Sequence, residues 1–393
     1  MSRDPVVILA ARRTPVGAFQ GVFAGVTAPQ LGSAALRAAI ADSGLPASEI
    51  DEVIMGCVLP AGLGQAPARQ AALGAGIPAS VPTTTVNKMC GSAMRAVMLA
   101  ADQILAGSAR VIAAGGLESM TNAPYLLPKA RAGYRMGHQE VLDHMFTDGL
   151  QSPWDGQLMG CFAEATSAKY GFTREAQDDF ARESARRAQA AVASGAFARE
   201  VAPVSTKTRK GEALIDKDET PGAIDVSKIS TLKPAFKKDG TVTAASSASI
   251  SDGAAAVVLA RESLAAARGL KALARILGHA SFAREPEWFT LAPVGAIQKL
   301  LRQLEWKAGD VDLYEVNEAF AAVTMAAIKD LSLDPAKVNV NGGACALGHP
   351  IGATGTRILT TLIYALQSRG LKRGIASLCI GGGEATAIAI EML

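Results

Sequence analysis

The chain has 393 residues, of which 49% are hydrophobic and 19% are charged. This composition excludes a disordered protein. The length favours two or three domains, and a chain of this size folds without stabilisation by disulfide bonds or a bound metal ion. The net charge of +3 contains no block of like charge, so a nucleic-acid partner is not expected. No apolar run reaches the roughly 18 residues of a membrane span. The apolar stretch near the amino terminus is too short for a signal peptide. We therefore expect a cytoplasmic protein with no membrane partner.

Apolar runs typical of buried strands alternate along the chain with segments of helical periodicity. Strands are predicted at Val6–Ala10, Glu52–Met55, Arg110–Ala114, Ala254–Leu259, Leu313–Val316 and Ile375–Ile380. Helices are predicted at Leu31–Ser43, Ser92–Ala106, Pro293–Leu304, Ala319–Leu331 and Gly355–Ser368. This alternation predicts an α/β fold whose strands are covered by helices on both faces.

Two halves of the chain repeat the same motifs in the same order. The letters IADSGLPASEIDEVIMG resemble LRQLEWKAGDVDLYEVN, and ARVIAAGGLESM resembles RGIASLCIGGGEATA. In this alignment Asp51 corresponds to Asp312, and Cys90 lies near the position of His349. The repeat indicates a duplicated α/β domain whose two corresponding turns face one another.

The middle of the chain, about residues 121–241, breaks this repeat. It has Pro- and Gly-rich stretches, then an amphipathic helix predicted over Arg174–Ser194 with Thr173 as its N-cap. The stretch Ser205–Lys238 is predicted to be polar and irregular. An insertion of this length is typical of a lid, a binding loop or an oligomer contact.

Five cysteines are widely spaced and form no C-x-x-C pair, so reduced thiols and no metal site are expected. Cys90 lies in TTTVNKMCGSAMRAVMLA, where a β-branched run ends and a helix is predicted to begin at about Gly91. A helix amino terminus favours the thiolate, so we expect a lowered pKa for Cys90. The alternative is a buried structural cysteine.

His349 lies in the Gly-rich turn of VNVNGGACALGHPIGATGTR. An imidazole within hydrogen-bond reach of a thiol activates that thiol as a nucleophile. The alternative is a histidine that caps a helix or fills a turn.

Two further candidate residues, a second cysteine and an asparagine, lie at the ends of predicted strands. Cys379 precedes three glycines in IASLCIGGGEATAI, where free backbone amides such as that of Gly381 are suited to an oxyanion. Cys379 is a candidate acid/base, a resolving cysteine or a core residue. Asn317 in YEVNEAFA is either a helix cap or a ligand of a water beside a reacting carbonyl. The glycine spacing fits neither nucleotide-binding motif, which makes nucleotide binding a weak interpretation.

Together, VNKMCGSAMRA, VNEAFA, NGGACALGHPIGATG and CIGGGEA resemble the motifs of the thiolase family in order and spacing, nearly from end to end. The resemblance implies a five-layered α-β-α-β-α fold made of two similar halves. It implies an amino-terminal half at residues 1–120, completed by about 242–270, and a carboxy-terminal half at 271–393. The inserted segment 121–241 is implied to bind CoA and to build a homotetramer, a dimer of dimers.

The implied activity is that of an acetyl-CoA C-acetyltransferase. It joins two acetyl-CoA molecules to acetoacetyl-CoA and CoA, or cleaves a 3-oxoacyl-CoA by thiolysis, with CoA thioesters as substrates and no tightly bound cofactor. By this resemblance Cys90 is the acylated nucleophile, His349 activates it, and Cys379 moves the α-proton. Asn317, through a water, and His349 stabilise the enolate oxygen. The amides of Cys90 and Gly381 form a second oxyanion hole. Fatty-acid, ketone-body or polyhydroxyalkanoate precursor metabolism is the implied setting.

The sequence departs from this pattern where relatives contact the substrate. Leu158, before Met159, stands where short-chain relatives usually carry a histidine, which allows longer acyl chains. The pantetheine-contacting serine aligns with Ala248, between Ser247 and Ser249. Candidate substrate contacts are therefore Leu158, Met159, Ala244, Ser247, Ala248, Ser249, Phe289 and Phe320. The usual loop arginine has no clear match, so Lys207, Arg209 or Lys210 is the candidate charge toward CoA.

Three other functions compete with a short-chain thiolase. The first is a 3-ketoacyl-CoA thiolase of fatty-acid degradation with a broader range of chains. The second is a decarboxylating condensing enzyme, which usually lacks the cysteine of CIGGG. The third is a non-catalytic acyl-CoA-binding protein, which would have lost one of Cys90, His349 and Cys379. All three of these residues are present.

Overall fold

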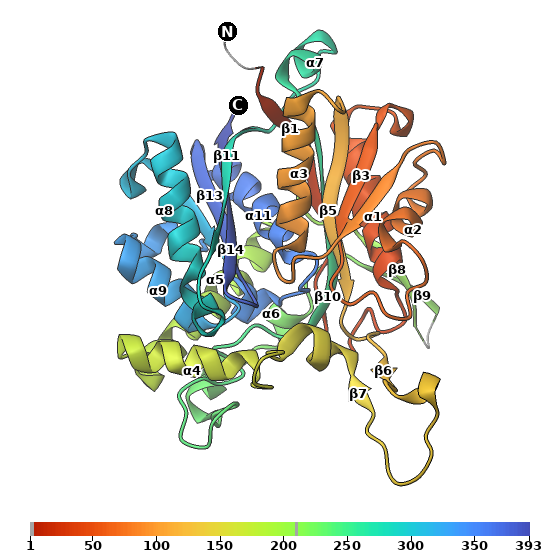
Figure 1. Ribbon diagram of the computed structural model, residues 1–393. Coiled ribbons are helices and arrows are strands. Elements are labelled where there is room, and N and C mark those ends of the chain that lie inside the picture. The colour runs from red at the N-terminus through yellow and green to blue at the C-terminus, as the bar shows by residue number, and fades with distance from the viewer. Residues whose placement is uncertain (1–3, 209–210) are drawn as a thin grey trace.

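The computed structural model describes residues 4–208 and 211–393. One sheet of ten strands runs through the protein in the order β12-β13-β14-β11-β1-β10-β5-β3-β4, with the short β2 beside β10. Helices cover both faces of each half of this sheet (Figure 1). The predicted α/β layering is confirmed.

The first half of the sheet contains β1 (Val6–Arg13), β2 (Gly17–Ala18), β3 (Glu52–Gly56), β4 (Thr83–Val86), β5 (Val111–Ser119) and β10 (Ser251–Arg261). Its helices are α1 (Ala28–Ser43), α2 (Pro67–Gly74) and α3 (Ser92–Ala106), and α7 (Glu262–Ala267) follows β10. Strand β3 runs parallel to β4 and β5, whereas β10 is antiparallel to both β5 and β1.

The second half repeats this arrangement with β11 (Ala274–Ala283), β12 (Leu313–Val316), β13 (Arg373–Ile380) and β14 (Glu384–Met392). Its helices are α8 (Ala292–Leu304), α9 (Ala321–Leu331), the short α10 (Ala344–Leu347) and α11 (Thr354–Arg369). The predicted strands and helices are confirmed within a few residues. Strands β11 and β14 are not among the predicted strands, because their Ala-rich sequences have few consecutive β-branched residues and favour a helix as much as a strand.

The duplication is visible in two equivalent aspartates. Asp51 Oδ2 accepts hydrogen bonds from Arg110 N and Val111 N, at the start of β5. Asp312 Oδ2 accepts the same pair of bonds from Lys372 N and Arg373 N, at the start of β13. In each half, a carboxylate at the start of one strand therefore holds the start of the parallel neighbour.

The layers follow from which side chains share a core. Val97 of α3 and Leu362 of α11 pack in one cluster with Ile112 of β5 and Ile388 of β14. Helices α3 and α11 are thus the middle layer, enclosed by the two halves of the sheet. Helices α1 and α2 cover the outer face of the first half, and α8 and α9 cover that of the second (Figure 1). The two halves of the sheet are joined by only two residue pairs between β1 and β11.

The inserted segment is more ordered than its composition suggests. It contains β6 (Tyr125–Leu126), β7 (Leu142–Asp143), α4 (Met159–Tyr170), α5 (Arg174–Ser194), β8 (Val204–Thr208), β9 (Gly211–Ile215) and α6 (Thr220–Ala223). Helix α5 has the predicted bounds, and Thr173 Oγ1 accepts from Ala176 N as the predicted N-cap. The prediction that 205–238 is irregular is wrong for its first part, because β8 and β9 pair as antiparallel strands and their backbone N–H and C=O groups bond one another.

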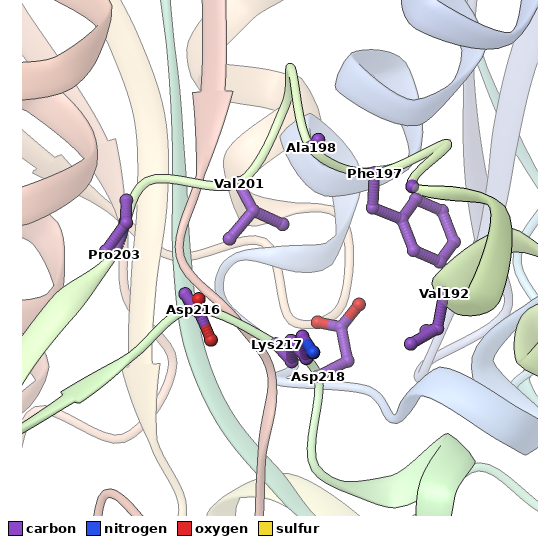
Figure 2. A pocket seen from close by; sticks show the side chains of 9 residues that line it. Val192, Phe197, Ala198, Val201, Pro203, Asp216, Lys217 and Asp218 are labelled. Atoms are coloured by element: carbon purple, nitrogen blue, oxygen red, sulfur yellow. The ribbon is translucent and has the colours of Figure 1, made fainter.

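A buried arginine ties this insertion to the first half of the sheet. Arg13, at the end of β1, is fully buried and donates to Glu200 (2.6 Å) and to both oxygens of Asp218 (2.6 and 2.9 Å). Its guanidinium also lies 4.9 Å from the centre of the Phe197 ring. Figure 2 shows Phe197 and Asp218 at a neighbouring surface cavity of about 280 Å³. The insertion therefore docks onto β1 through paired charges.

Within residues 4–208 and 211–393, no helix combines the length and the apolar character that crossing a membrane requires.

Replacing Arg13 is expected to destabilise the fold, because Arg13→Met leaves two buried carboxylates without their cation. We expect the free energy of unfolding to fall by about 3–5 kcal/mol, measured by urea denaturation. The control is Arg268→Met, which removes an ion pair with Glu49 at the surface and is expected to cost at most about 1 kcal/mol. Equal losses in the two variants would contradict the docking role of Arg13.

Candidate functional site

The candidate site lies where the amino-terminal ends of α3 and α11 meet. Thr356 Oγ1 of α11 donates to Ala93 O of α3 at 3.2 Å. A Cβ on Gly355 would collide with the backbone of Met94, so only glycine permits this contact. Cys90 lies two residues before α3 and His349 lies five residues before α11. The pairing of the two helix ends thus brings both predicted residues to one end of the middle layer.

The turn that carries Cys90 is strained and tightly packed. Met89 has φ of 47°, in the left-handed region that side chains rarely adopt. A Cβ on Gly91 would collide with Ile380 Cδ1, at the end of β13. Strain of this kind persists where the surrounding packing enforces it, and functional sites are common places for it. The close contact at Gly91 also brings Cys90 beside the strand end that carries Cys379.

The expected lowering of the Cys90 pKa is wrong. Burial raises the pKa of this thiol to about 11, although backbone N–H groups of Gly381 and of Cys90 itself hydrogen-bond the sulfur and act in the opposite direction. Nearby Glu118 adds to the increase. Desolvation outweighs the helix amino terminus here, so Cys90 is a neutral thiol near pH 7 and needs a base.

His349 has the properties of such a base. Thr354 Oγ1 donates its only hydrogen to Pro350 O (2.9 Å), so it accepts from His349 Nδ1 (2.7 Å). The ring proton is therefore on Nδ1, and the lone pair is on Nε2. Among the described residues, Nε2 is buried and has no hydrogen-bond partner. Burial, with a smaller contribution from Arg357, lowers the pKa of His349 to about 3, so the ring is neutral.

Glu118 holds the loops around Cys90 and His349, although no motif in the sequence predicts this role. Its carboxylate accepts from Val58 N (3.0 Å) and Leu59 N (3.2 Å), and the N–H of Gly352 also hydrogen-bonds it. Burial raises its pKa to about 7. The available signal was a carboxylate at the end of an apolar strand, VIAAGGLES.

Cys379 lies at the end of β13 in an apolar, aromatic cluster. It is fully buried and packs with Phe289, Phe320 and, at the margin, Met159. Burial raises the pKa of Cys379 well above its ordinary value, and the repulsion that a thiolate at Cys379 would meet from one at nearby Cys90 adds to the increase. Cys379 is therefore also a protonated thiol near neutral pH. The cluster brings four of the sequence-predicted residues together.

Asn317 follows β12 and is almost fully buried, yet neither polar atom of its side chain has a partner among the described residues. It does not cap α9, whose N-cap is Phe320. The neighbouring Glu318 accepts from Ser184 Oγ (2.6 Å), Asn339 Nδ2 (2.8 Å) and Cys345 N (3.1 Å). Glu318 thereby fixes the Gly-rich loop before His349, while the Asn317 amide remains available for a water or a ligand.

A second cavity, of about 380 Å³, lies between α5 and the segment after α6. Ala244, Ser249, Lys228, Leu232 and Cys345 are among its lining residues. The backbone oxygen of Ser249 also accepts from His349 N at 3.1 Å, which connects the cavity wall to the turn that carries His349.

The other predicted substrate contacts lie outside this cavity lining. Ser247 Oγ is buried and donates to Thr243 O (2.7 Å), and Ala248 N donates to Ala319 O. Leu158 is partly exposed at the N-cap of α4. Of the two serines that flank Ala248, only Ser249 lines the cavity.

The cation at this cavity differs from the candidates that the sequence suggested. Lys228 lines it, whereas Lys207 lies in β8 opposite Glu212. Arg209 and Lys210 lie outside the described residues.

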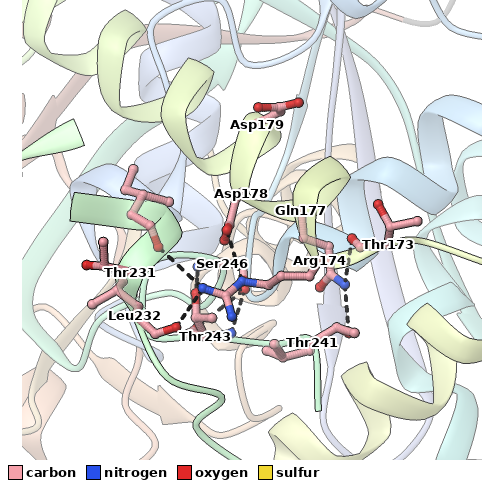
Figure 3. A network of polar contacts seen from close by, with 12 residues as sticks. Thr173, Arg174, Gln177, Asp178, Asp179, Thr231, Leu232, Thr241, Thr243 and Ser246 are labelled. Carbon is pink, nitrogen blue, oxygen red and sulfur yellow. Dashed lines mark hydrogen bonds and ion pairs between the residues drawn. The ribbon is translucent and has the colours of Figure 1, made fainter. Parts of the chain in front are cut away.

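A polar network fixes the cavity wall (Figure 3). Arg174, in the first turn of α5, donates to Asp178 (2.9 Å) and to the backbone oxygen of Leu232 (2.6 Å). Gln177 donates to Thr241 Oγ1 at 2.9 Å. These bonds attach residues 229–241 to α5, so the rigid helix determines where the lining loop lies.

Comparisons with known proteins agree with this architecture. The family model "Thiolase, N-terminal domain" matches residues 6–263, and "Thiolase, C-terminal domain" matches residues 270–392. An acetyl-CoA acetyltransferase of Pseudomonas aeruginosa is 50% identical over 387 residues, which cover 98% of each chain. One of Escherichia coli is 50% identical over 389 residues, which cover 98% of this chain and 99% of the relative.

Solved structures show the same fold. The acetyl-CoA acetyltransferase of Bacillus anthracis superposes with a TM-score of 0.97 at 43% identity, covering 100% of this chain and 99% of that one. The Acat5 thiolase of Ascaris suum, solved in complex with coenzyme A, gives a TM-score of 0.94 at 43% identity, covering 99% and 100%. From its sequence and its fold, this chain belongs to the thiolase family.

Proposed function

We propose that this protein is an acyltransferase that joins two acetyl-CoA molecules to acetoacetyl-CoA and CoA, and that cleaves 3-oxoacyl-CoA in the reverse direction. Relatives that are 45–50% identical over nearly the whole chain carry the name acetyl-CoA acetyltransferase. The observation that supports the chemistry best is the junction of α3, α11 and β13. At this end of the middle layer lie two protonated thiols and the turn of His349, whose Nε2 has no hydrogen-bond partner among the described residues.

In thiolysis, Cys90 Sγ attacks the 3-oxo carbon while its proton passes to Nε2 of His349. The bond between C2 and C3 then breaks, and the electron pair left on C2 takes the proton of Cys379, which releases acetyl-CoA. The thiol of CoA next attacks the acyl-enzyme and gives its proton to the Cys379 thiolate, while Cys90 leaves and recovers its own proton from His349. A covalent intermediate divides one difficult carbon–carbon cleavage into two easier steps.

The unpaired polar groups of the site take the oxyanion roles. The free amide of Asn317 holds a water that, with His349, stabilises the enolate oxygen of the departing acetyl-CoA. The N–H groups of Cys90 and Gly381 stabilise the oxyanion that forms on the carbon under attack. Fixed donors in a buried site stabilise such a charge without reorganisation of solvent.

The finer properties of the protein remain proposals that rest on the family resemblance. They are a homotetramer, a cytoplasmic location, a role in fatty-acid, ketone-body or polyhydroxyalkanoate precursor metabolism, acyl-CoA and CoA as the ligands, and no tightly bound cofactor. CoA is proposed to bind in the 380 Å³ cavity, with Ser249 and Lys228 as contacts.

Two cysteine variants test the separate roles of Cys90 in acylation and of Cys379 in proton transfer. Cys90→Ser is expected to abolish acyl-enzyme formation, measured by mass spectrometry after incubation with acetyl-CoA. Cys379→Ala is expected to acylate at Cys90 but to lose at least about 100-fold in thiolysis of acetoacetyl-CoA, because the C2 proton has no donor. Cys161→Ser is the control. Wild-type thiolysis in all three variants would overturn the proposed function.

The pH dependence follows from the neutral imidazole. The pKa of His349 is about 3 and that of Cys90 is about 11, so the reactive protonation state of both groups persists between these values. The acylation kcat/KM is therefore expected to stay flat from about pH 5 to about pH 9. Stopped-flow acylation by acetyl-CoA measures this profile. Because burial raises the pKa of Glu118 to about 7, only a titration near 6.5 that persists in Glu118→Gln would contradict a buried, neutral His349.

The network around Arg174 is expected to affect CoA binding more than chemistry. Arg174→Met removes the bonds to Asp178 and Leu232 and loosens the cavity wall. We expect KM for CoA to rise about tenfold with kcat changed less than about threefold, as steady-state thiolysis would measure. The matched control is Arg182→Met, which removes an exposed ion pair with Asp179 on the same helix. Equal effects in the two variants would show that Arg174 does not support CoA binding through the cavity wall.

A further inference from the structure

An ion pair joins the turn that carries Cys90 (residues 88–91, the cysteine turn) to the turn that follows β13 (residues 381–383, the glycine turn). Lys88 Nζ donates to the carboxylate of Glu384, the residue that directly follows the glycine turn and begins β14. The two residues are 296 positions apart in the chain, so only the fold brings them together. Among the ion pairs of the described residues, this is the one that connects the two turns.

The Lys88 backbone is bound firmly to the start of α3. Its N–H donates to Ser92 Oγ at 2.8 Å, and its carbonyl oxygen accepts from Gly91 N at 3.0 Å. Ser92 Oγ in turn donates to Met89 O at 2.6 Å. These bonds close the turn around Cys90. A contact that holds the Lys88 side chain in place therefore also restrains the backbone N–H of Cys90.

The glycine turn has little stiffness of its own. Gly382 and Gly383 both have φ of 96°, and glycine loses more conformational freedom on ordering than any other residue. The backbone oxygen of Gly383 accepts from Arg284 N at 2.8 Å, which attaches the turn to the residue after β11. The ion pair between Glu384 and Lys88 adds a second attachment, toward the cysteine turn.

The two turns carry the two donors of the proposed oxyanion hole, the N–H groups of Cys90 and Gly381. Both donors must reach one oxygen atom at about 3 Å, and a misplacement of about 1 Å can cost about 100-fold in rate. The contact between Gly91 and Ile380 limits how closely the turns approach one another. The ion pair is attractive and opposes their separation. The two contacts together define one distance between the donors.

We propose that Lys88 and Glu384 are positioning residues, whose ion pair keeps the N–H groups of Cys90 and Gly381 directed at the same oxyanion during acylation. This inference rests on the proposed function. The pair transfers no proton and forms no covalent bond, because it acts through the backbone of the two turns.

The exposure of the pair indicates where its effect is measurable. The side chains of Lys88 and Glu384 are 25% and 38% exposed, so water screens their attraction. Partly exposed pairs of this kind contribute little to the stability of a fold. We therefore expect the pair to affect the rate of acylation much more than the unfolding of the protein.

Neutral variants test this expectation. Lys88→Met and Glu384→Gln are each expected to slow the acylation of Cys90 by acetyl-CoA about tenfold, measured by stopped flow. KM for CoA in thiolysis is expected to change less than about twofold, and the melting temperature to fall by less than about 3 °C. The matched control is Glu262→Gln, which breaks an ion pair of similar exposure with Arg275 and is expected to acylate at the wild-type rate. Wild-type acylation in Lys88→Met and Glu384→Gln would overturn the inference.

Charge reversal separates the ion pair from the individual residues. Lys88→Glu places two carboxylates side by side and is expected to slow acylation at least as much as Lys88→Met does. The double variant Lys88→Glu/Glu384→Lys restores the attraction and is expected to recover acylation to within about threefold of the wild-type rate. A double variant as slow as Lys88→Glu alone would refute a role for the paired charges.

Infrared difference spectra of the acetylated protein report on the oxyanion hole itself. Hydrogen bonds from the N–H groups of Cys90 and Gly381 weaken the C=O bond of an isotope-labelled acetyl group on Cys90. Its stretching band is therefore expected at higher wavenumber in Lys88→Met than in the wild-type protein or in Glu262→Gln. An unchanged band in Lys88→Met would contradict the positioning role. Failure of the wild-type protein to form any acetyl-enzyme would instead overturn the proposed function.

Discussion

The close contact between the amino-terminal ends of α3 and α11 is the constraint on which the candidate site depends. Gly355 lies against the backbone of Met94, and Gly91 lies against Ile380. A side chain at Gly355 would push the two helices apart, and a side chain at Gly91 would displace the Ile380 side chain. Because the duplicated halves place Cys90 and His349 at equivalent turns, this one packing contact brings together residues that are far apart in the sequence.

Burial then decides the protonation of the groups gathered there. Desolvation raises the pKa of both Cys90 and Cys379 and lowers that of His349. Near neutral pH the site therefore contains two thiols and one neutral imidazole, with no standing thiolate–imidazolium pair. The proton moves only as the carbon–sulfur bond forms, so charge develops where the N–H groups of Cys90 and Gly381 are already directed.

The sequence predicted the fold class, most helices and strands, and the residues of the site motifs, because these rest on local periodicity and on short motifs. The sequence did not predict the properties that depend on packing between residues far apart in the chain. The raised pKa of Cys90 depends on atoms from β13 and on Glu118, which lie far from it in the chain. The role of Thr354 depends on a bond to Pro350 O that no spacing rule indicates. A cavity beside Gly381 and Gly382 is bordered by Trp154 and Met159 of the inserted segment, a proximity that no local pattern in the sequence indicates.

The central claim is that Cys90 rests as a protonated thiol and that His349 is neutral. The most direct measurement is the ultraviolet absorbance of the thiolate as a function of pH, taken as the difference between the wild-type protein and Cys90→Ser. The account predicts that the thiolate of Cys90 appears only as the pH approaches about 11. A thiolate that is already present at neutral pH would contradict it.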